Sequence, residues 1–246
     1  LQRAAYGGIL STLELLQTGS LLRVSSKVKK YAKSENRQES YETLEPLFSA
    51  LETVPQLEAE INRCILSETE IADDASTSLR SVRREIKVSN DRVKEQLNNI
   101  IHSNAYKNML QDPVVTMRNG RFCVPVKQEY RNAFNGMIHD QSSTGATVFM
   151  EPIAVVNLNN RIKELEAAEK AEIEKILATL SAAVHEYNET LASNQQILNE
   201  LDFIFAKASL ALSMNGVKPN FGNYVDIKKA RHPLLDPATV VPTDIT

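Results

Sequence analysis

Residues 112–127 read Asp112-Pro-Val-Val-Thr-Met-Arg-Asn-Gly-Arg-Phe-Cys-Val-Pro-Val-Lys127, and this stretch decides how the chain is organised. It contains two β-rich runs separated by Asn119-Gly120, which is the strongest short-range sequence signal for a two-residue hairpin turn. Pro125 has no backbone N–H to donate, so we predict that the second strand lies at an edge of its sheet. The stretch therefore predicts a β-hairpin with Asn119-Gly120 as the central pair of a type I′ turn.

A second pair of apolar runs, residues 136–138 and 146–150, flanks the turn sequence Ser142-Ser-Thr-Gly145. Backbone N–H groups in a turn of this kind can cradle a phosphate. Neither a lysine nor a capped helix follows it, which favours a plain hairpin turn. Residues 113–150 are therefore predicted to form one small β unit, and strands are expected only there and in the C-terminal tail.

Long amphipathic helices are predicted on both sides of the β unit. Before it, apolar residues recur every three, four or seven positions, which predicts a helix from Ser76 to Ser103 with a length of roughly 42 Å. After Glu151-Pro152 a similar seam continues over about 40 residues. A further helix is predicted from Gln195 to Met214, with Asn215-Gly216 as its C-terminal cap. Narrow apolar seams of this kind need a partner helix.

The N-terminal part is predicted to be helical as well. Ser11 and Glu14 form a capping box, so we expect a helix to start there and to run towards Asn36. Residues 23–37 hold six basic residues and one acid, and an acidic stretch follows them. Within that acidic stretch, Gln56 to Leu66 is predicted as a short helix.

Two long helices that flank a β insert must run out and back, so we predict an antiparallel coiled-coil arm with a β tip. The charges favour this pairing. Residues 75–110 carry seven basic and three acidic residues, whereas residues 157–206 carry four basic and nine acidic residues. A solvated face on each helix would also explain the two charge runs separately.

Composition limits the class of protein. The net charge of the 246 residues is −3, so nucleic-acid binding would have to come from local basic patches. Cys64 and Cys123 lie far apart, which argues against a disulfide framework or a zinc site and suits a reducing compartment. No run of about 18 apolar residues occurs and no leader follows Leu1. We therefore expect an internal fragment of a longer cytoplasmic protein, with no membrane partner.

Residues 112–127 resemble the beginning of the clamp in the bacterial MutS-two subfamily, which belongs to the MutS family of DNA mismatch repair ATPases. Further stretches extend the resemblance over essentially the whole chain. These are Leu1-Gln-Arg-Ala-Ala-Tyr-Gly-Gly-Ile-Leu-Ser11, Ile138-His-Asp-Gln-Ser-Ser-Thr-Gly-Ala-Thr-Val-Phe-Met-Glu-Pro152, Leu158-Asn-Asn-Arg-Ile-Lys-Glu-Leu-Glu166, Ala230-Arg-His-Pro-Leu-Leu235 and Val241-Pro-Thr-Asp-Ile245. The last two are similar to the family's lead-in to the ATPase domain.

Together with the predicted arm, the resemblance implies a mainly α fold. This fold is a helical core with a long antiparallel coiled-coil lever that carries a small β-rich clamp at its tip. The expected domains are the helical core (1–74), an ascending lever helix (75–111), the clamp (112–152), a descending lever helix with the return to the core (153–216), and a truncated lead-in to the ATPase domain (217–246).

The resemblance also implies a function. Family members are homodimeric ATPases associated with mismatched and branched DNA, with suppression of recombination, and with rescue of stalled or collided ribosomes. A C-terminal Smr domain supplies a nuclease or ribosome-related activity. No G-x-x-x-x-G-K-[ST] motif occurs here, so we expect ATP and Mg to bind in an ATPase domain outside this chain. The chain itself is expected to be non-catalytic and to bind no cofactor. Its expected partners are branched DNA or ribosomal RNA, its own ATPase domain and a second subunit.

Four basic residues of the β unit are the candidate nucleic-acid contacts: Arg118, Arg121, Lys127 and Arg131. Arg118 and Arg121 bracket the hairpin turn, where both side chains could meet a backbone phosphate. Both are expected to be exposed, so changing both to Glu should barely alter thermal stability. Solvated turn charges are the alternative interpretation. Two acids in the same unit reduce its net charge to +2, which is a weak electrostatic footprint.

No catalytic or metal-binding residue is expected. His139-Asp140 could suggest a metal site or an acid–base pair, but adjacent residues on a strand point to opposite faces. The other histidines show no ligand spacing. Two functions stay open: a nucleic-acid- or ribosome-gripping part of a MutS-type ATPase, or a purely structural coiled-coil spacer or dimerisation arm. A β tip with arginines at its turn favours the first, and the sequence leaves the choice between DNA and ribosomal RNA open.

Overall fold

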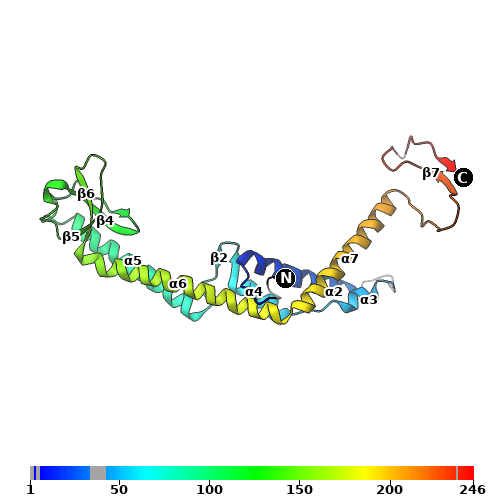
Figure 1. Ribbon diagram of the computed structural model, residues 1–246, viewed down its shortest axis with the longest axis horizontal. Coiled ribbons are helices and arrows are strands. Elements are labelled where there is room, and N and C mark those ends of the chain that lie inside the picture. Colours follow the sequence, from blue (N-terminus) through cyan, green and yellow to red (C-terminus); the bar gives the residue numbers. More distant parts are fainter. Residues whose placement is uncertain (1–2, 4–5, 34–42, 237) are drawn as a thin grey trace. The chain divides into compact units, whose positions relative to one another are not determined.

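The computed structural model describes residues 3, 6–33, 43–236 and 238–246 (Figure 1). Within these residues, helices α2 to α7 combine with three small antiparallel sheets, so the fold is mixed α/β with helix as its larger part. In the same part of the chain, no helix has both the length and the apolar character that crossing a membrane requires.

The chain forms two compact units. The first consists of Leu1–Arg23 with Val54–Asn188, and the second of Val24–Thr53 with Glu189–Thr246. The first unit contains the β unit and the two long helices, and it is where the candidate contacts lie. The division into five functional segments remains a prediction.

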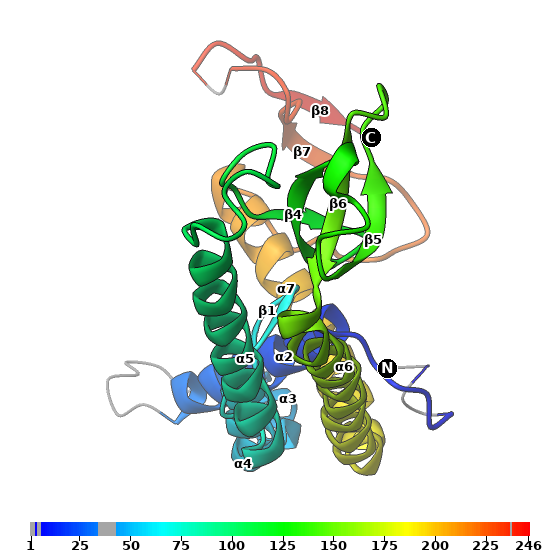
Figure 2. The same ribbon diagram turned by 90° about the vertical axis from the view of Figure 1, so that its left-hand side faces the viewer.

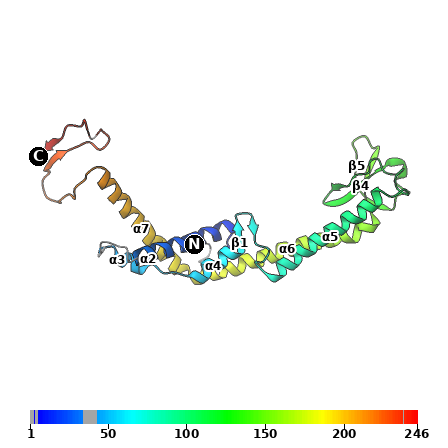
Figure 3. The same ribbon diagram turned by 180° about the vertical axis from the view of Figure 1, so that it is seen from behind.

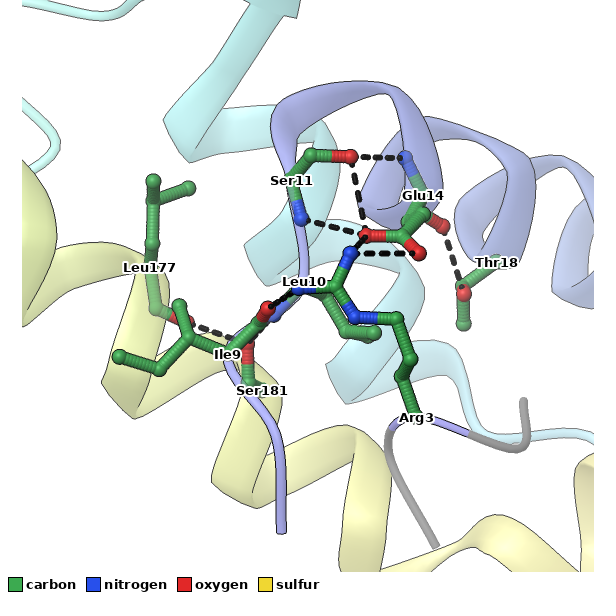
Figure 4. Close-up of polar contacts among 8 residues, drawn as sticks. All are labelled: Arg3, Ile9, Leu10, Ser11, Glu14, Thr18, Leu177 and Ser181. Carbon is green, nitrogen blue, oxygen red and sulfur yellow. Dashed lines mark hydrogen bonds and ion pairs between the residues drawn. The ribbon is translucent and has the colours of Figure 1, made fainter. Parts of the chain in front are cut away.

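Helix α2 (Thr12–Ala32) begins at the capping box predicted from the sequence (Figure 4). The Ser11 N–H donates to Oε2 of Glu14 at 2.8 Å, and the Glu14 N–H donates back to Oγ of Ser11 at 3.3 Å. Two backbone donors at the helix start are thus satisfied reciprocally. The predicted continuation towards Asn36 falls on residues 34–42, which lie outside the described residues.

The start of α2 is fixed against α6 (Ile153–Glu186) by a second set of contacts in Figure 4. The Leu10 N–H donates to the Ser181 hydroxyl at 2.8 Å, and that hydroxyl donates to the Leu177 carbonyl at 2.6 Å. Leu10 and Ser181 are both buried. Because buried polar groups are costly without partners, these bonds favour one arrangement of the two helices.

A short hairpin follows α4 (Pro55–Cys64), where the sequence predicted helix as far as Leu66. Ile65–Ser67 (β1) pairs antiparallel with Glu70–Ile71 (β2). Ile65 and Ile71 are buried while Leu66 is exposed, so the alternation is that of a strand. The expectation that strand occurs only in the β unit and the tail is therefore wrong.

Helices α5 (Thr77–Ile101) and α6 pack side by side in the first unit (Figures 1 and 3). The Ser76 side chain caps α5 by accepting a hydrogen bond from the Leu79 N–H at 3.0 Å. Polar contacts join the helices at three levels: Ser76 with Glu172 (2.9 Å), Arg83 with Glu169 (2.7 Å) and Glu85 with Arg161 (2.8 Å). Residue numbers rise along α5 as they fall along α6, so the two helices run out and back.

A break at Tyr187 separates α6 from α7 (Asn188–Ser213). The seam predicted one helix that continued to Leu191, and this is wrong. Tyr187 adopts φ −104° and ψ 16°, outside the helical region. The position carries neither Gly nor Pro, so the sequence has no breaker signal there. The break falls where the first compact unit passes into the second.

The β unit is a four-stranded antiparallel sheet in the order β3-β4-β6-β5, and Figure 2 shows it together with α5 and α6. Its strands are Thr116–Arg118 (β3), Arg121–Lys127 (β4), Gly136–Gln141 (β5) and Thr147–Pro152 (β6). Ser142 to Gly145 form the turn between β5 and β6, where the Ser142 N–H donates to the Thr147 carbonyl at 2.9 Å. This is the plain hairpin turn predicted for that segment.

Pro125 lies in an inner strand, so its predicted place at an edge is wrong. β4 pairs with β3 on one side and with β6 on the other. The Pro125 carbonyl accepts a hydrogen bond from the Gln111 N–H at 2.9 Å, away from β6. The N and the C=O of one antiparallel strand residue point to the same side, so the missing N–H also faces Gln111. There the pairing is a single bridge between Leu110 and Val126, and one absent donor is tolerated.

The sheet and the two long helices share one apolar core. Its buried members come from α5 and the loop after it, from the sheet with the loop after β4, and from α6: Val93, Leu97, Leu110, Val124, Val126, Phe134, Val148, Met150, Val155 and Ile162. The β tip is therefore not an independent module on the end of the helices. Its inner face is completed by α5 and α6.

The second compact unit packs α3 (Glu45–Ala50) and part of α2 against α7. Its buried core consists of Phe48, Leu51, Ile197 and Leu201. Asn215, with a φ of 50°, ends α7 as predicted, and the Gly216 N–H donates to the Ala211 carbonyl at 2.7 Å. The tail pairs Ile227–Ala230 (β7) antiparallel with Thr243–Ile245 (β8).

Candidate nucleic-acid interface

The hairpin turn between β3 and β4 has the predicted type I′ geometry. Asn119 and Gly120 have φ values of 50° and 70°, and the flanking Arg118 and Arg121 face each other across the hairpin. The Asn119 side-chain amide donates to the His139 carbonyl at 2.9 Å. The turn is therefore anchored to β5 by this bond, while Asn119 and Gly120 both remain exposed.

Arg121 points to a buried carboxylate. Its Nη1 lies 3.0 Å from Oε1 of Glu151, whose side chain is 1% exposed, while the Arg121 side chain itself is 23% exposed. A buried charge is costly unless it is paired and hydrogen-bonded. Arg121 therefore neutralises Glu151 within the tip, which differs from the solvent-facing position that the turn suggested.

The same carboxylate has two further partners. Nδ2 of Asn159, on α6, donates to Oε1 at 2.6 Å, and Nε2 of His139 lies 2.6 Å from Oε2. His139 sits at the bulge in the pairing of β5 with β6, which explains why it reaches Glu151. The acid next to it, Asp140, is not its partner. A polar network centred on Glu151 of β6 thus joins four elements, namely β4, β5, β6 and α6.

Arg118 is half-buried and also has an acidic partner. Its Nε lies 3.2 Å from Oδ2 of Asp140, and its guanidinium carbon lies 4.0 Å from the centre of the Phe149 ring. The ion pair and the cation–π contact both hold the guanidinium on the sheet. Both turn arginines are therefore engaged inside the tip, although the partner of Arg118 is the more exposed one.

Lys127 and Arg131 are less constrained. Nζ of Lys127 donates to the Asn108 carbonyl at 3.0 Å, so this lysine keeps its positive charge without an acidic partner among the described residues. Arg131 is exposed, and within the same part of the chain its guanidinium contacts no acid. The two lie at the end of β4 and just after it. They are the predicted residues that remain open to a polyanion.

Burial also affects the cysteine of this region. Cys123 in β4 is fully buried, and this burial, together with the negative charge of Glu151, raises the pKa of its thiol to about 11. A thiol with so high a pKa is protonated at neutral pH and is a poor nucleophile or metal ligand. Within the described residues, no three side chains among His, Cys, Asp and Glu gather to hold a metal ion.

Comparison with known proteins identifies the family. No family model matches the chain. It is 50% identical over 252 residues to the protein named endonuclease MutS2 of Lachnoclostridium phytofermentans, and 52% identical over 247 residues to that of Agathobacter rectalis. Both alignments cover 100% of this chain. The chain belongs to the MutS2 family. It spans about a third of the length of these relatives, namely 32% and 31%.

This assignment agrees with the family resemblance of the sequence. Glu151 and Asn159, the residues that organise the tip of this MutS2 chain, were not among the predicted site residues. The sequence offers one weak signal for Glu151, which is a lone acid that directly follows a run of strand residues. Nothing in the local pattern marks Asn159, because its role depends on how α6 packs against β6.

Proposed function

We propose that this chain forms the helical core, coiled-coil lever and clamp with which a cytoplasmic MutS2-type ATPase grips nucleic acid. The ligands would be branched DNA, where binding suppresses recombination, and the ribosomal RNA of stalled or collided ribosomes. ATP hydrolysis with Mg, and the nuclease activity after which the relatives are named, would be carried out by other parts of the intact protein.

One observation carries the proposal: Lys127 and Arg131 lack acidic partners among the described residues, whereas Arg118 and Arg121 have them. We infer that Lys127 and Arg131 make the phosphate contacts. Arg118 and Arg121 would support the shape of the tip, and Arg118 could still contribute through its exposed side.

Few contacts give weak binding, so the intact protein is proposed to act as a homodimer. With one tip from each subunit, the second contact becomes intramolecular and adds avidity without any new type of contact. Phosphate contacts carry no sequence information, which fits a protein that recognises the shape of a junction or a ribosome. The proposed clamp would therefore bind its ligand without recognising a particular base sequence.

The test compares two double variants of the intact protein. Lys127→Gln with Arg131→Gln removes two tip cations. Lys170→Gln with Lys175→Gln removes two exposed cations of α6 and serves as the matched control. Binding to a four-way DNA junction and to ribosomes is measured across a salt titration. Each lost phosphate contact should reduce the slope of log affinity against log salt by about 1.

We expect the tip variant to lose about two units of that slope for at least one ligand and the control to lose none. The ligand that responds identifies the target. Equal slopes for the wild type and the tip variant with both ligands, with both proteins folded, would reject the clamp function and favour a spacer.

A further inference from the structure

Helix α5 carries a row of cations on its outward face. Arg84, Lys87 and Lys94 are exposed, and their spacings of three and seven residues place them along one side of the helix. The buried residues of α5 are Leu79, Val93 and Leu97, and none of these three cations is among them. We call Arg84, Lys87 and Lys94 the α5 stripe.

The neighbouring Arg83 shows what the stripe residues lack. Arg83 turns inward, where Nε lies 2.7 Å from Oε1 of Glu169 and Nη1 lies 2.5 Å from Oδ1 of Asp73. These contacts raise the pKa of its guanidinium. Among the described residues, the three members of the α5 stripe make no such ion pair. One residue thus holds the two helices together, while the next along the chain points its charge outward.

The first part of α6 does not offer a comparable surface. Arg161 of α6 is bound by Glu85 at 2.8 Å and by Glu164 at 3.4 Å, and Lys163 is bound by Glu166 at 2.9 Å. Neighbouring acidic side chains therefore neutralise both of these cations. Uncompensated positive charge on the paired helices is therefore greater on α5 than on this part of α6.

Two exposed acids, Asp91 and Glu95, lie among the cations of α5, and Arg92 is a further exposed cation nearby. The stripe residues and Arg92 outnumber these acids by four to two. The outward face therefore keeps a positive balance. This small positive charge is too weak to bind an anion alone. It is sufficient for a secondary contact with a ligand that another part of the protein already holds.

We propose that the α5 stripe is a second phosphate-contacting surface, along which duplex DNA lies when the tip holds it. This inference rests on the proposed function of the tip. From Arg84 to Lys94 the helix rises about 15 Å, and a duplex of that length presents roughly nine phosphate charges. Long lysine and arginine side chains can reach such a regular array without a pocket.

A protein partner fits this surface less well. Protein–protein interfaces are depleted of lysine and enriched in aromatic residues. Two of the three stripe residues, Lys87 and Lys94, are lysines, and α5 contains no aromatic residue. A repeated row of outward cations matches a polyanion, and the duplex backbone is the polyanion that the proposed function supplies.

The experiment uses the intact protein and a four-way DNA junction with long duplex arms. Arg84→Gln with Lys87→Gln is compared with the control Lys170→Gln with Lys175→Gln, since each removes two exposed cations from one helix of the pair. We expect the α5 variant to reduce the salt slope of binding by about 2 and the control to leave it unchanged. Shortening the duplex arms should remove the difference between the α5 variant and the wild type.

The outcomes separate this inference from the proposed function. If the tip variant weakens DNA binding while the α5 variant binds with the wild-type slope, the stripe is a solvated face and the inference is wrong. If the wild-type protein binds no DNA, or the α5 variant responds only with ribosomes, duplex DNA is not its ligand and the inference is also wrong. A lower slope for the α5 variant on DNA, with unchanged thermal unfolding, supports it.

Discussion

Nη1 of Arg121 lies 3.0 Å from Oε1 of Glu151, and the Glu151 side chain is 1% exposed. The pair links β4 to the end of β6, directly before the chain enters α6. Removing one member of a buried pair leaves the other charge without compensation, which is more costly than the pair is favourable. The main role of Arg121 is therefore to stabilise the tip, and contact with nucleic acid is at most a secondary role.

We predict that Arg121→Ala lowers the free energy of unfolding by about 2–3 kcal/mol, because Glu151 then keeps only its contacts with Asn159 and His139. Arg118→Ala is the matched control. Its partner Asp140 is 48% exposed, so this change should cost at most about 1 kcal/mol. Urea unfolding of both variants measures the difference. Equal losses of unfolding free energy in the two variants would mean that the burial of Glu151 does not make its ion pair more important for stability than the exposed pair of Arg118.

The same contrast corrects an expectation from the sequence. Charge reversal at Arg118 and Arg121 was predicted to leave stability almost unchanged, because both residues were expected to be exposed. Arg121→Glu would instead place a second carboxylate beside Glu151. A loss of nucleic-acid binding in that variant would therefore reflect an altered tip. For this reason the binding test uses Lys127 and Arg131.

The hairpin turn gives a second prediction. Gly120 has a φ of 70°, which β-branched residues rarely adopt, so Gly120→Val should destabilise the tip by about 1–3 kcal/mol. A Cβ at this position would also lie 2.8 Å from Nζ of Lys163. Thermal unfolding followed by circular dichroism measures the loss of stability.

Two further variants separate backbone strain from this close contact. Gly120→Asn adds a Cβ but tolerates a positive φ, so it should cost less than Gly120→Val. Combining Gly120→Val with Lys163→Ala removes the neighbouring amine and should not restore stability. If it does restore stability, the loss came from crowding against a flexible side chain and not from the turn conformation.

Local signals in the sequence were sufficient where one segment decides its own structure. The Asn119-Gly120 turn, the Ser11 capping box and the Asn215 helix end all depend on a few adjacent residues, and the structure contains all of them. Apolar spacing likewise located α5 almost to the residue, because a seam repeats within one helix. These features need no knowledge of what packs against them.

The missed features depend on residues distant in the chain. Glu151 became a buried centre only because Arg121, His139 and Asn159 converge on it from other elements. Pro125 is tolerated inside the sheet because Gln111, rather than a full strand, lies on the side to which its nitrogen points. Neither fact could be read from spacing or propensity, which describe one segment at a time.

The two cysteines predict a pH dependence. Burial is the main cause that raises the pKa of the Cys64 and Cys123 thiols from 9.0 to about 11. Between pH 9 and 11 the folded chain therefore binds more protons than the unfolded chain, so the thiol contribution to stability is complete below pH 9 and is lost as the pH rises towards 11. Unfolding in urea at several pH values measures this loss.

The double variant Cys64→Ala with Cys123→Ala provides the control, because it keeps every other titrating group. It should be less stable than the wild type at pH 8 owing to lost packing, and this difference should shrink as the pH approaches 11. In addition, neither thiol of the native wild type should react readily with a disulfide reagent at pH 8. A constant difference across the pH range would contradict the shifted pKa values.

The last prediction concerns whether the tip can be separated from the helices that carry it. Leu97 of α5 is fully buried in the core that α5 and α6 share with the sheet, whereas Leu79, equally buried, lies near the other end of α5 and outside that cluster. Leu97→Ala and Leu79→Ala should each cost about 2–5 kcal/mol, since each removes a buried side chain and leaves a cavity. Their effects on the tip should differ. Amide hydrogen exchange in β4 and β6 should become faster in Leu97→Ala, because the sheet loses part of its own core, and should change much less in Leu79→Ala. Equal acceleration in the two variants would mean that the whole first unit opens as one. No acceleration in Leu97→Ala would mean that the tip holds its fold without the helices.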